Sequence, residues 1–460
     1  MISKSSKPMV VNPLKVSQTM GAVLAFLGLN RSMPLIHANQ GCSAYGKILF
    51  IRHFFEPVPI QTTALDHLAA VMDPDQQLID ALVNVCHKNE PEVIGVLTAG
   101  VSEAQGADVK RVINSFKEQY PQYRSTELIP VNVPDFEGCL ESGFAKATES
   151  MINHFVPETT PYNSNSDDLV VLPGSMLTPA DIEAIRRMVE AFGLNPIFIP
   201  DISQSLNGHL ADERYRSITY GGFDVADANR IANACGCISI GLSMVQAANL
   251  LQERTGMPLY SFEGLTGLAS NDRFINVLMT LSGKPVPEWL KRQRACLRDA
   301  YLDAHFYLGQ CRAAVAADPD LLFSFSAIAS EVGIDLKYAV TTHMVEDLEE
   351  LTFRQVVIGD LSDFESLSFE HPIDLVIGNS YLAKYCDEQS LPLYRAGYPI
   401  FDRMGASRVC RVGYAGSTDL TIELANLVWQ NREQGVSPYE SILKPMESAC
   451  GSASTTYAPH

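Results

Sequence analysis

The chain has 460 residues, with 34 Lys or Arg against 53 Asp or Glu and a formal net charge of −19 at pH 7. This acidic balance argues against nucleic acid and anionic membranes as partners, because both are bound by clustered basic side chains. Apolar residues make up 46% of the chain, which is typical of a globular protein, and the length predicts about three domains.

The apolar runs are too short or too polar for a membrane span, which requires roughly 20 apolar residues. The run from Met20 ends at Asn30-Arg31, and the uncharged stretch 231–251 contains several amides. The N-terminus has no apolar signal region, so we expect a cytoplasmic location. Ten cysteines are too dilute for a disulfide scaffold and predict buried thiols, with an occasional metal ligand.

The first third of the chain predicts two buried strands that are each followed by a helix. One strand ends near His37, a tight turn follows at 39–41, and a helix begins around Cys42. The other strand covers 91–98, and its helix starts near Ala107. The stretch 157–168 is rich in Pro, Ser, Asn and Asp, which indicates a linker between domains.

The middle of the chain has the clearest strand–helix–strand pattern. The apolar run 169–172 predicts a buried strand, and Thr178 is placed to cap the following helix, with Pro179 at its first position and Asp181 completing a capping box. The helix is expected to end near Phe192, before Gly193, and the next strand covers 196–200. Further strands are expected at 336–340, 355–358 and 374–377.

This alternation predicts an α/β protein of three Rossmann-like domains, each with a parallel sheet flanked by helices. The expected boundaries are 1–165 for an N-terminal domain, 166–290 for a second and 291–444 for a third. The remaining residues, 445–460, are small and polar and are expected to form a disordered tail. The usual phosphate loops, the His-Glu-x-x-His zinc motif and the Gly-x-Ser-x-Gly elbow do not occur.

Cys42 lies in the first turn of its predicted helix, in the run MPLIHANQGCSAYG. Unpaired N–H groups and the positive end of the helix dipole favour a thiolate at this position, which is the form that binds metal. The alternative is a small buried residue at a crowded turn. The residues by themselves leave both interpretations open.

Several motifs, taken together, resemble the nitrogenase component 1 family over nearly the whole chain. The Gln-Gly-Cys block followed by Arg-His-Phe is specific to it. The matching stretches are residues 17–66, VIGVLTAGVSEAQGAD (93–108), PDFEGC (134–139), TYGG (219–222), 294–321 ending in AADPDLL, and 396–417 from AGYPIFDRMGA to GYAGS. The resemblance implies a fold of the nitrogenase component 1 type.

Within this family, the resemblance is to the branch that assembles the iron–molybdenum cofactor. The catalytic β subunit has three cluster cysteines, and at the matching positions this chain has Ser17, Cys42 and Gly100. The resemblance therefore implies that Cys42 binds a 4Fe-4S cluster shared with a NifE-type partner in a heterotetramer. It implies a scaffold rather than an enzyme.

On such a scaffold, an iron–sulfur precursor of the cofactor is bound transiently while molybdenum and homocitrate are inserted. The implied further partners are the donor of that precursor, the docking nitrogenase iron protein, and nitrogenase as the acceptor of the finished cofactor. Three alternatives remain: the equivalent scaffold for a vanadium-type cofactor, an electron-transferring reductase subunit of the nitrogenase-like family, and an α/β binding module without metal.

Other positions have a structural and a functional interpretation. The resemblance places Cys139 beside the cluster, where it is either a neighbouring group or a buried thiol, and places Met72 at a docking surface or in the core. Cys235 and Cys237 form a Cys-x-Cys pair without a second pair nearby, so metal binding is disfavoured. His37 and His53 are either structural or cluster-contacting. The remaining candidates are Arg395, Arg403 and Arg411, which either guide an anionic cluster or form salt bridges.

Overall fold

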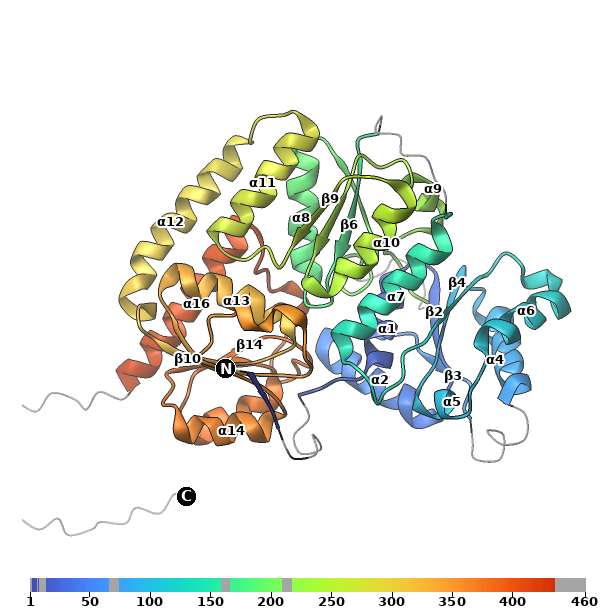
Figure 1. Cartoon of the computed structure of the whole chain (residues 1–460), viewed down its shortest axis with the longest axis horizontal. Helices are drawn as coiled ribbons and strands as arrows, with labels where there is room; N and C mark the ends of the chain where they lie inside the picture. The colour runs from blue at the N-terminus through green and yellow to red at the C-terminus, as the bar shows by residue number, and fades with distance from the viewer. Residues whose placement is uncertain are drawn as a thin grey trace, which may run out of the picture.

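The computed structural model describes residues 2–5, 7, 14–65, 74–158, 166–208 and 217–434. They form three parallel β-sheets with helices packed on their faces (Figure 1). Every pair of neighbouring strands in these sheets is parallel. The predicted α/β class with three parallel sheets is therefore confirmed.

The N-terminal unit has a four-stranded sheet in the order β3-β2-β4-β5. Strand β2 is buried along its whole length, as is β4. The elements of this unit are α1 (Gln18–Leu27), β2 (Ser32–Ile36), α2 (Gln40–Phe54), β3 (Gln61–Thr62), α4 (Pro74–Asn89), β4 (Val93–Leu97), α5 (Gly100–Ala104), α6 (Val109–Gln119), η1 (Pro121–Tyr123), β5 (Glu127–Val131) and α7 (Leu140–Phe155).

The second unit has the sheet order β7-β6-β8-β9. Its first helix begins as the sequence predicts: Thr178 accepts a hydrogen bond from Asp181 N, and Asp181 accepts one from Thr178 N, which completes the capping box. The elements are β6 (Asp168–Pro173), α8 (Pro179–Ala191), β7 (Asn195–Phe198), η2 (Val225–Asp227), α9 (Ala228–Ile231), β8 (Cys237–Ile240), η3 (Leu242–Met244), α10 (Val245–Thr255), β9 (Leu259–Phe262), α11 (Leu268–Ser282) and α12 (Glu288–Leu308).

The third unit has a six-stranded sheet in the order β1-β12-β11-β10-β13-β14. Its edge strand β1 comes from the start of the chain, with Ile2 opposite Val356 and Lys4 opposite Ile358, an insertion that the sequence did not suggest. The elements are β1 (Ile2–Lys4), β10 (Arg312–Ala316), α13 (Pro319–Val332), β11 (Asp335–Thr341), η4 (Glu346–Glu350), β12 (Gln355–Ile358), α14 (Leu361–Glu370), β13 (Leu375–Gly378), η5 (Ser380–Leu382), α15 (Ala383–Glu388), β14 (Leu393–Arg395), η6 (Ala406–Arg408) and α16 (Gly413–Gln434).

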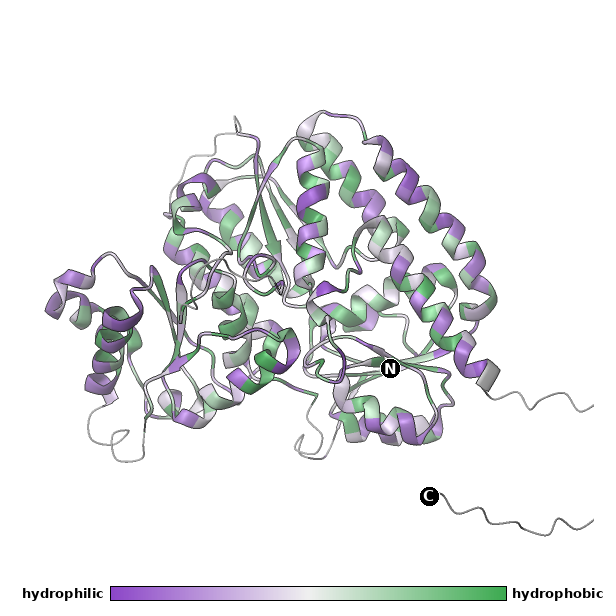
Figure 2. Cartoon of the chain, turned by 180° about the vertical axis from the view of Figure 1, so that it is seen from behind, coloured by the Kyte–Doolittle hydropathy of each residue, from purple (hydrophilic) through white to green (hydrophobic). Residues whose placement is uncertain are grey.

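The core follows the sheets, and the long outer helices are amphipathic. Figure 2 shows hydrophobic residues along the strands and hydrophilic residues on the outer faces of the long helices. Helices α1 and α7 cross so closely that a Cβ on Gly143 would lie 1.9 Å from the carbonyl oxygen of Gln18. This crossing fixes the start of α7 against the start of α1. No helix among the described residues is long and apolar enough to cross a membrane.

Candidate functional site

The candidate site lies at the carboxyl edge of the N-terminal sheet, where ligands of open α/β sheets are usually bound. Helix α2, which contains Cys42, follows β2, while Gly100 follows β4. Asp135 comes from the loop after β5. Its Oδ1 accepts a hydrogen bond from Gly100 N. A Cβ on Gly100 would lie 2.9 Å from that oxygen, so the Asp135 carboxylate fills the space beside Gly100.

The Cys42 thiol is half-buried and makes a weak contact with Asn39, whose Oδ1 lies 3.5 Å from the sulfur. Burial and the nearby Asp135 carboxylate raise the pKa of Cys42, and the hydrogen bond from its own backbone N–H only partly offsets them. The predicted preference for the thiolate is therefore not found, because burial and the Asp135 carboxylate outweigh the backbone N–H of the first turn. Because a metal ion competes with the proton for the sulfur, the thiol remains a suitable ligand.

An iron–sulfur cluster with four irons prefers four thiolates. Ser17 and Gly100 offer none, and the described residues contain no group of three or more His, Cys, Asp or Glu that could hold a metal ion. Cys42 therefore suits a cluster only if further ligands come from outside the described part of this chain. The chemistry of this edge fits one corner of a shared cluster.

Apolar side chains are exposed around Cys42, a feature that the sequence reading missed. Tyr45 and Ile48 lie on the outer face of α2 with 46% and 60% of their surface exposed, and Phe55, the C-cap residue of that helix, is 54% exposed. In the third unit, Tyr381 is exposed as well and packs edge-on against Phe401. The signal that could have revealed this surface is the apolar residues of 45–55, which fall on both faces of the predicted helix.

Cys139 is fully buried and faces the third unit. Its Sγ lies 3.2 Å from His343 Nδ1. Burial, followed by the Asp318 and Glu141 carboxylates, raises the pKa of Cys139 well above the usual value for a thiol. The thiol is therefore neutral at physiological pH. Its role beside the cluster stays a prediction.

The two predicted histidines are satisfied within the chain. His53 Nδ1 accepts a hydrogen bond from Ile400 N at 2.9 Å, and its ring packs on Tyr398. His37 Nδ1 lies 3.1 Å from Thr63 Oγ1. Burial lowers the pKa of His53 to about 3 and that of His37 to about 4, so both rings are neutral. These contacts favour the structural interpretation.

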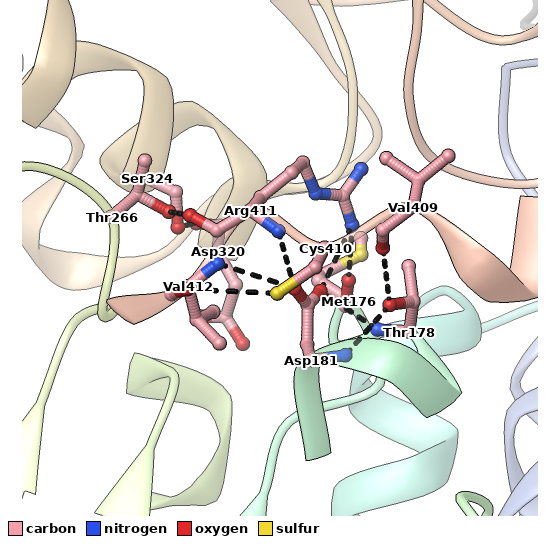
Figure 3. Close-up of polar contacts among 10 residues, drawn as sticks. All are labelled: Met176, Thr178, Asp181, Thr266, Asp320, Ser324, Val409, Cys410, Arg411 and Val412. Atoms are coloured by element: carbon pink, nitrogen blue, oxygen red, sulfur yellow. Dashed lines mark hydrogen bonds and ion pairs between the residues drawn. The ribbon is translucent and has the colours of Figure 1, made fainter. Parts of the chain in front are cut away.

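Two of the three predicted arginines form salt bridges. Arg395 pairs with Asp402, with 2.6 Å between the nearest nitrogen and oxygen. Arg411 is buried between the second and third units, where it pairs with Asp181 at 3.6 Å and donates a hydrogen bond to the carbonyl of Met176 (Figure 3). Arg403 lies exposed beside a groove along α16.

The remaining predicted positions do not join the site. Cys237 is buried in β8, and Cys235 precedes that strand. Met72 lies outside the described residues, as do the predicted tail 445–460 and most of the linker.

Comparisons with known proteins decide the family. The model of the nitrogenase component 1 type oxidoreductases matches residues 17–428. The chain belongs to the nitrogenase component 1 family. Two relatives in this family are the nitrogenase iron-molybdenum cofactor biosynthesis proteins NifN of Klebsiella pneumoniae, 39% identical with 99% of each chain covered, and of Bradyrhizobium diazoefficiens, 40% identical with 95% of this chain and 93% of the relative covered.

A solved structure supports the same family fold. The structure described as nitrogenase Cp1 at pH 6.5 superposes with a TM-score of 0.89 at 28% sequence identity, covering 94% of this chain and 96% of the other. The predicted component 1 type fold is therefore confirmed.

Proposed function

We propose that this chain is a scaffold subunit for assembly of the nitrogenase iron–molybdenum cofactor, the role stated in the names of its NifN relatives. The observation that carries the proposal is identity of about 40% over nearly the full length, combined with a single accessible cysteine at the carboxyl edge of the N-terminal sheet. A lone thiol of this kind suits the holding of a shared cluster.

In this role, Cys42 binds a 4Fe-4S cluster at the boundary with a NifE-type chain, which supplies the other ligands. Two features support a shared site. The Cys42 thiol has only a weak contact within the chain, and Ser17 and Gly100 provide no sulfur. The cluster would displace the thiol proton on binding, because iron is ligated by the thiolate.

The exposed apolar face of α2 supports docking of that NifE-type chain. Tyr45, Ile48 and Phe55 begin one turn beyond Cys42 and follow the helix, and the exposed Tyr381 of the third unit extends the surface. Large apolar side chains exposed on one surface commonly mark a protein–protein interface. Two such pairs would form the heterotetramer.

The assembled complex would bind the iron–sulfur precursor transiently, receive molybdenum and homocitrate, and pass the cofactor to nitrogenase. The precursor donor and the nitrogenase iron protein would dock on it in turn. Met72 remains our candidate for the docking of the iron protein, and Cys139 our candidate for a group that lies beside the cluster without binding iron.

The test is anaerobic co-expression with the NifE-type chain, comparing wild type with Cys42→Ala. Iron content and the electron-paramagnetic signal of the reduced cluster are measured on the purified complex. We expect Cys42→Ala to retain the partner and lose the signal. The matched control is Cys296→Ala, which removes an exposed thiol on α12 and should leave iron unchanged. Unchanged iron and signal in Cys42→Ala would refute the assignment.

A second assay separates scaffold from enzyme. The purified complex, supplied with the iron protein and reductant, should mature cofactor-free nitrogenase when molybdenum and homocitrate are added. Maturation with vanadium alone would favour the vanadium-type scaffold. Catalytic reduction of a small substrate by the complex itself, without maturation, would favour the reductase alternative.

A further inference from the structure

The three α/β units meet at a cluster of carboxyl groups, here called the carboxyl joint: the buried Glu141 and Asp320 and the half-buried Asp318. Glu141 lies in the first turn of α7, and Asp318 caps α13, whose second residue is Asp320. Glu141 Oε2 accepts a hydrogen bond from Asp320 N at 3.1 Å. This bond joins the N-terminal unit to the third unit.

Asp320 also joins the third unit to the second. Its Oδ2 accepts a hydrogen bond from Ser243 Oγ at 2.6 Å, and its Oδ1 accepts one from Ser243 N at 3.2 Å. A Cβ on Gly241 would lie 2.4 Å from Oδ2. The carboxyl group therefore packs directly against the bare backbone of the second unit. Asp320 thus contacts the N-terminal unit through its backbone N–H and the second unit through its side chain.

Further contacts close the joint. Thr342 Oγ1 donates to Asp318 Oδ1 at 2.5 Å, and Cys139 Sγ contacts His343 Nδ1 from across the boundary. The titratable and charged groups that face the three carboxyls are Cys139 from the start of α7, His343 from the loop after β11, and Lys15 from the segment before α1. The positive charge of Lys15 lowers the pKa of Asp318 by electrostatic attraction.

The joint contains more acid than base. Glu141 and Asp320 are 1% and 3% exposed, and Asp318 is half-buried. None of the ion pairs formed within the described part of the chain includes these three carboxylates. Burying an ionised carboxylate without a cation is strongly unfavourable, and such a group normally takes up a proton instead.

The cost of burying a negative charge raises the pKa of all three carboxyl groups. Burial raises the pKa of Asp318 and Asp320 to about 6, and burial together with the two aspartates raises the pKa of Glu141 well above the usual range for a carboxyl. The neutral His343 ring cannot compensate the charge, because burial lowers its pKa to about 4. Of the three carboxyl groups, Glu141 is thus the one whose surroundings most strongly favour the protonated form.

We propose that the carboxyl joint is a proton-dependent latch that locks the second and third units onto the N-terminal unit, and that loss of its proton loosens this boundary. Ionising Glu141 places a second negative charge beside Asp320 without a cation in contact. The repulsion between the two carboxylates, together with the cost of burying the charge, outweighs the stronger hydrogen bond from Asp320 N and loosens the packing around Ser243. The latch is independent of Cys42, so it does not rest on the proposed cofactor role.

The direct test compares wild type with Glu141→Gln between pH 5 and pH 8.5, using the purified full chain. The glutamine keeps the acceptor for Asp320 N and cannot ionise. The free energy of unfolding is measured by chemical denaturation. Subtracting the value of one protein from that of the other removes the pH dependence of the histidines and thiols, which both proteins share. A raised pKa in the folded state costs stability as pH rises above the ordinary carboxyl value. As pH rises, we therefore expect the unfolding constant of wild type to increase relative to that of Glu141→Gln by up to about tenfold per pH unit.

The control is Glu149→Gln, two turns further along α7, which should parallel wild type at every pH. Hydrogen exchange should locate the effect: as pH rises, the first turns of α7 and α13 should exchange increasingly faster in wild type than in Glu141→Gln, while α12 should not differ. A pH-independent difference between wild type and Glu141→Gln would overturn the proposal.

Infrared spectroscopy of wild type provides a test that requires no variant to fold. A protonated buried carboxyl gives a carbonyl band separate from that of carboxylates. We expect such a band at pH 7 and its loss at alkaline pH. The lack of any protonated carboxyl band at pH 7 would overturn the proposal.

Discussion

The edge around Cys42 and the boundary around Asp181 use polar groups in opposite ways. At the edge, the Cys42 sulfur has one weak contact and apolar side chains face outward. At the boundary, Asp181 is 1% exposed in its side chain and accepts hydrogen bonds from the backbone N–H groups of Thr178, Arg411 and Val412 while pairing with the Arg411 guanidinium (Figure 3).

The difference distinguishes polar groups whose partners lie within the chain from groups that remain accessible to another molecule. A buried polar group must find its partners within the fold, because an unpaired one is costly. A half-exposed thiol with exposed apolar neighbours has no such requirement. Changes at the boundary should therefore cost stability, whereas changes at the edge should cost function. The following predictions test this contrast, from the largest expected effect to the smallest.

Asp181→Ala should destabilise the chain by about 3–5 kcal/mol, because it leaves the Arg411 guanidinium buried without its carboxylate. The measurement is the free energy of unfolding by urea. Glu183→Ala, which removes a half-exposed partner of Arg187 on the same helix, is the control and should cost less than about 1 kcal/mol. Equal losses in the two variants would contradict the contrast.

His53, which accepts a hydrogen bond from Ile400 N, should make the contact between α2 and the third unit sensitive to acid. Burial, and then Arg411, lowers its pKa to about 3, so the folded state resists protonation while the unfolded chain takes up a proton near pH 6.5. Stability is therefore lost as pH falls below 6.5, by up to about tenfold in the unfolding constant per pH unit.

His53→Asn, which keeps an acceptor for Ile400 N without titrating there, should remove this component. Denaturant unfolding of both proteins between pH 4.5 and pH 7.5 measures it. Parallel curves for the two proteins would show that His53 does not contribute.

Gly143→Ala should destabilise the α1–α7 crossing by about 1–3 kcal/mol or more, since the added methyl group overlaps a backbone carbonyl that cannot move aside. Thermal unfolding would measure the loss. Gly41→Ala adds the same group to the exposed first turn of α2, where its nearest neighbour is Asn39 Oδ1 at 3.3 Å, and should leave stability unchanged or slightly higher. The reverse ranking would mean that the crossing is not rigid.

Thr178→Ala should cost about 1 kcal/mol, because it removes the acceptor for Asp181 N at the start of α8. The same hydroxyl donates to the carbonyl of Val409 at 2.7 Å, so the loss should be reduced in Thr178→Ser, which keeps both bonds. Chemical denaturation of the two variants measures the difference, and identical losses would exclude the hydroxyl as the cause.

Cys42→Ser should change the free energy of unfolding by less than about 0.5 kcal/mol, as expected for a site without a special packing role. The loss should instead appear in the iron content of the complex. A large loss of stability in the isolated chain would show that Cys42 is a packing residue and not an unfinished ligand site.

Local patterns were sufficient for much of the fold. The capping box at Thr178, the buried run at 169–172 and the strand at 355–358 were each readable, because helix capping and strand burial depend on neighbours in sequence. The expected strand at 336–340 also lies within β11. The pairing of β1 with β12 joins residues more than 350 positions apart, and no local pattern encodes such a contact.

The candidate site divides in the same way. The sequence identified Cys42, its place in a first helical turn and the family, because motif spacing and residue identity are properties of the chain itself. Only the tertiary structure placed Asp135 beside Gly100, turned Cys139 toward His343 and buried Glu141 with two aspartates. These contacts join residues that lie far apart in the sequence, and burial of charge depends on what surrounds a group in space. The order of residues determined the elements and the candidate ligand, whereas packing decided which groups are neutral, which are paired and which remain accessible.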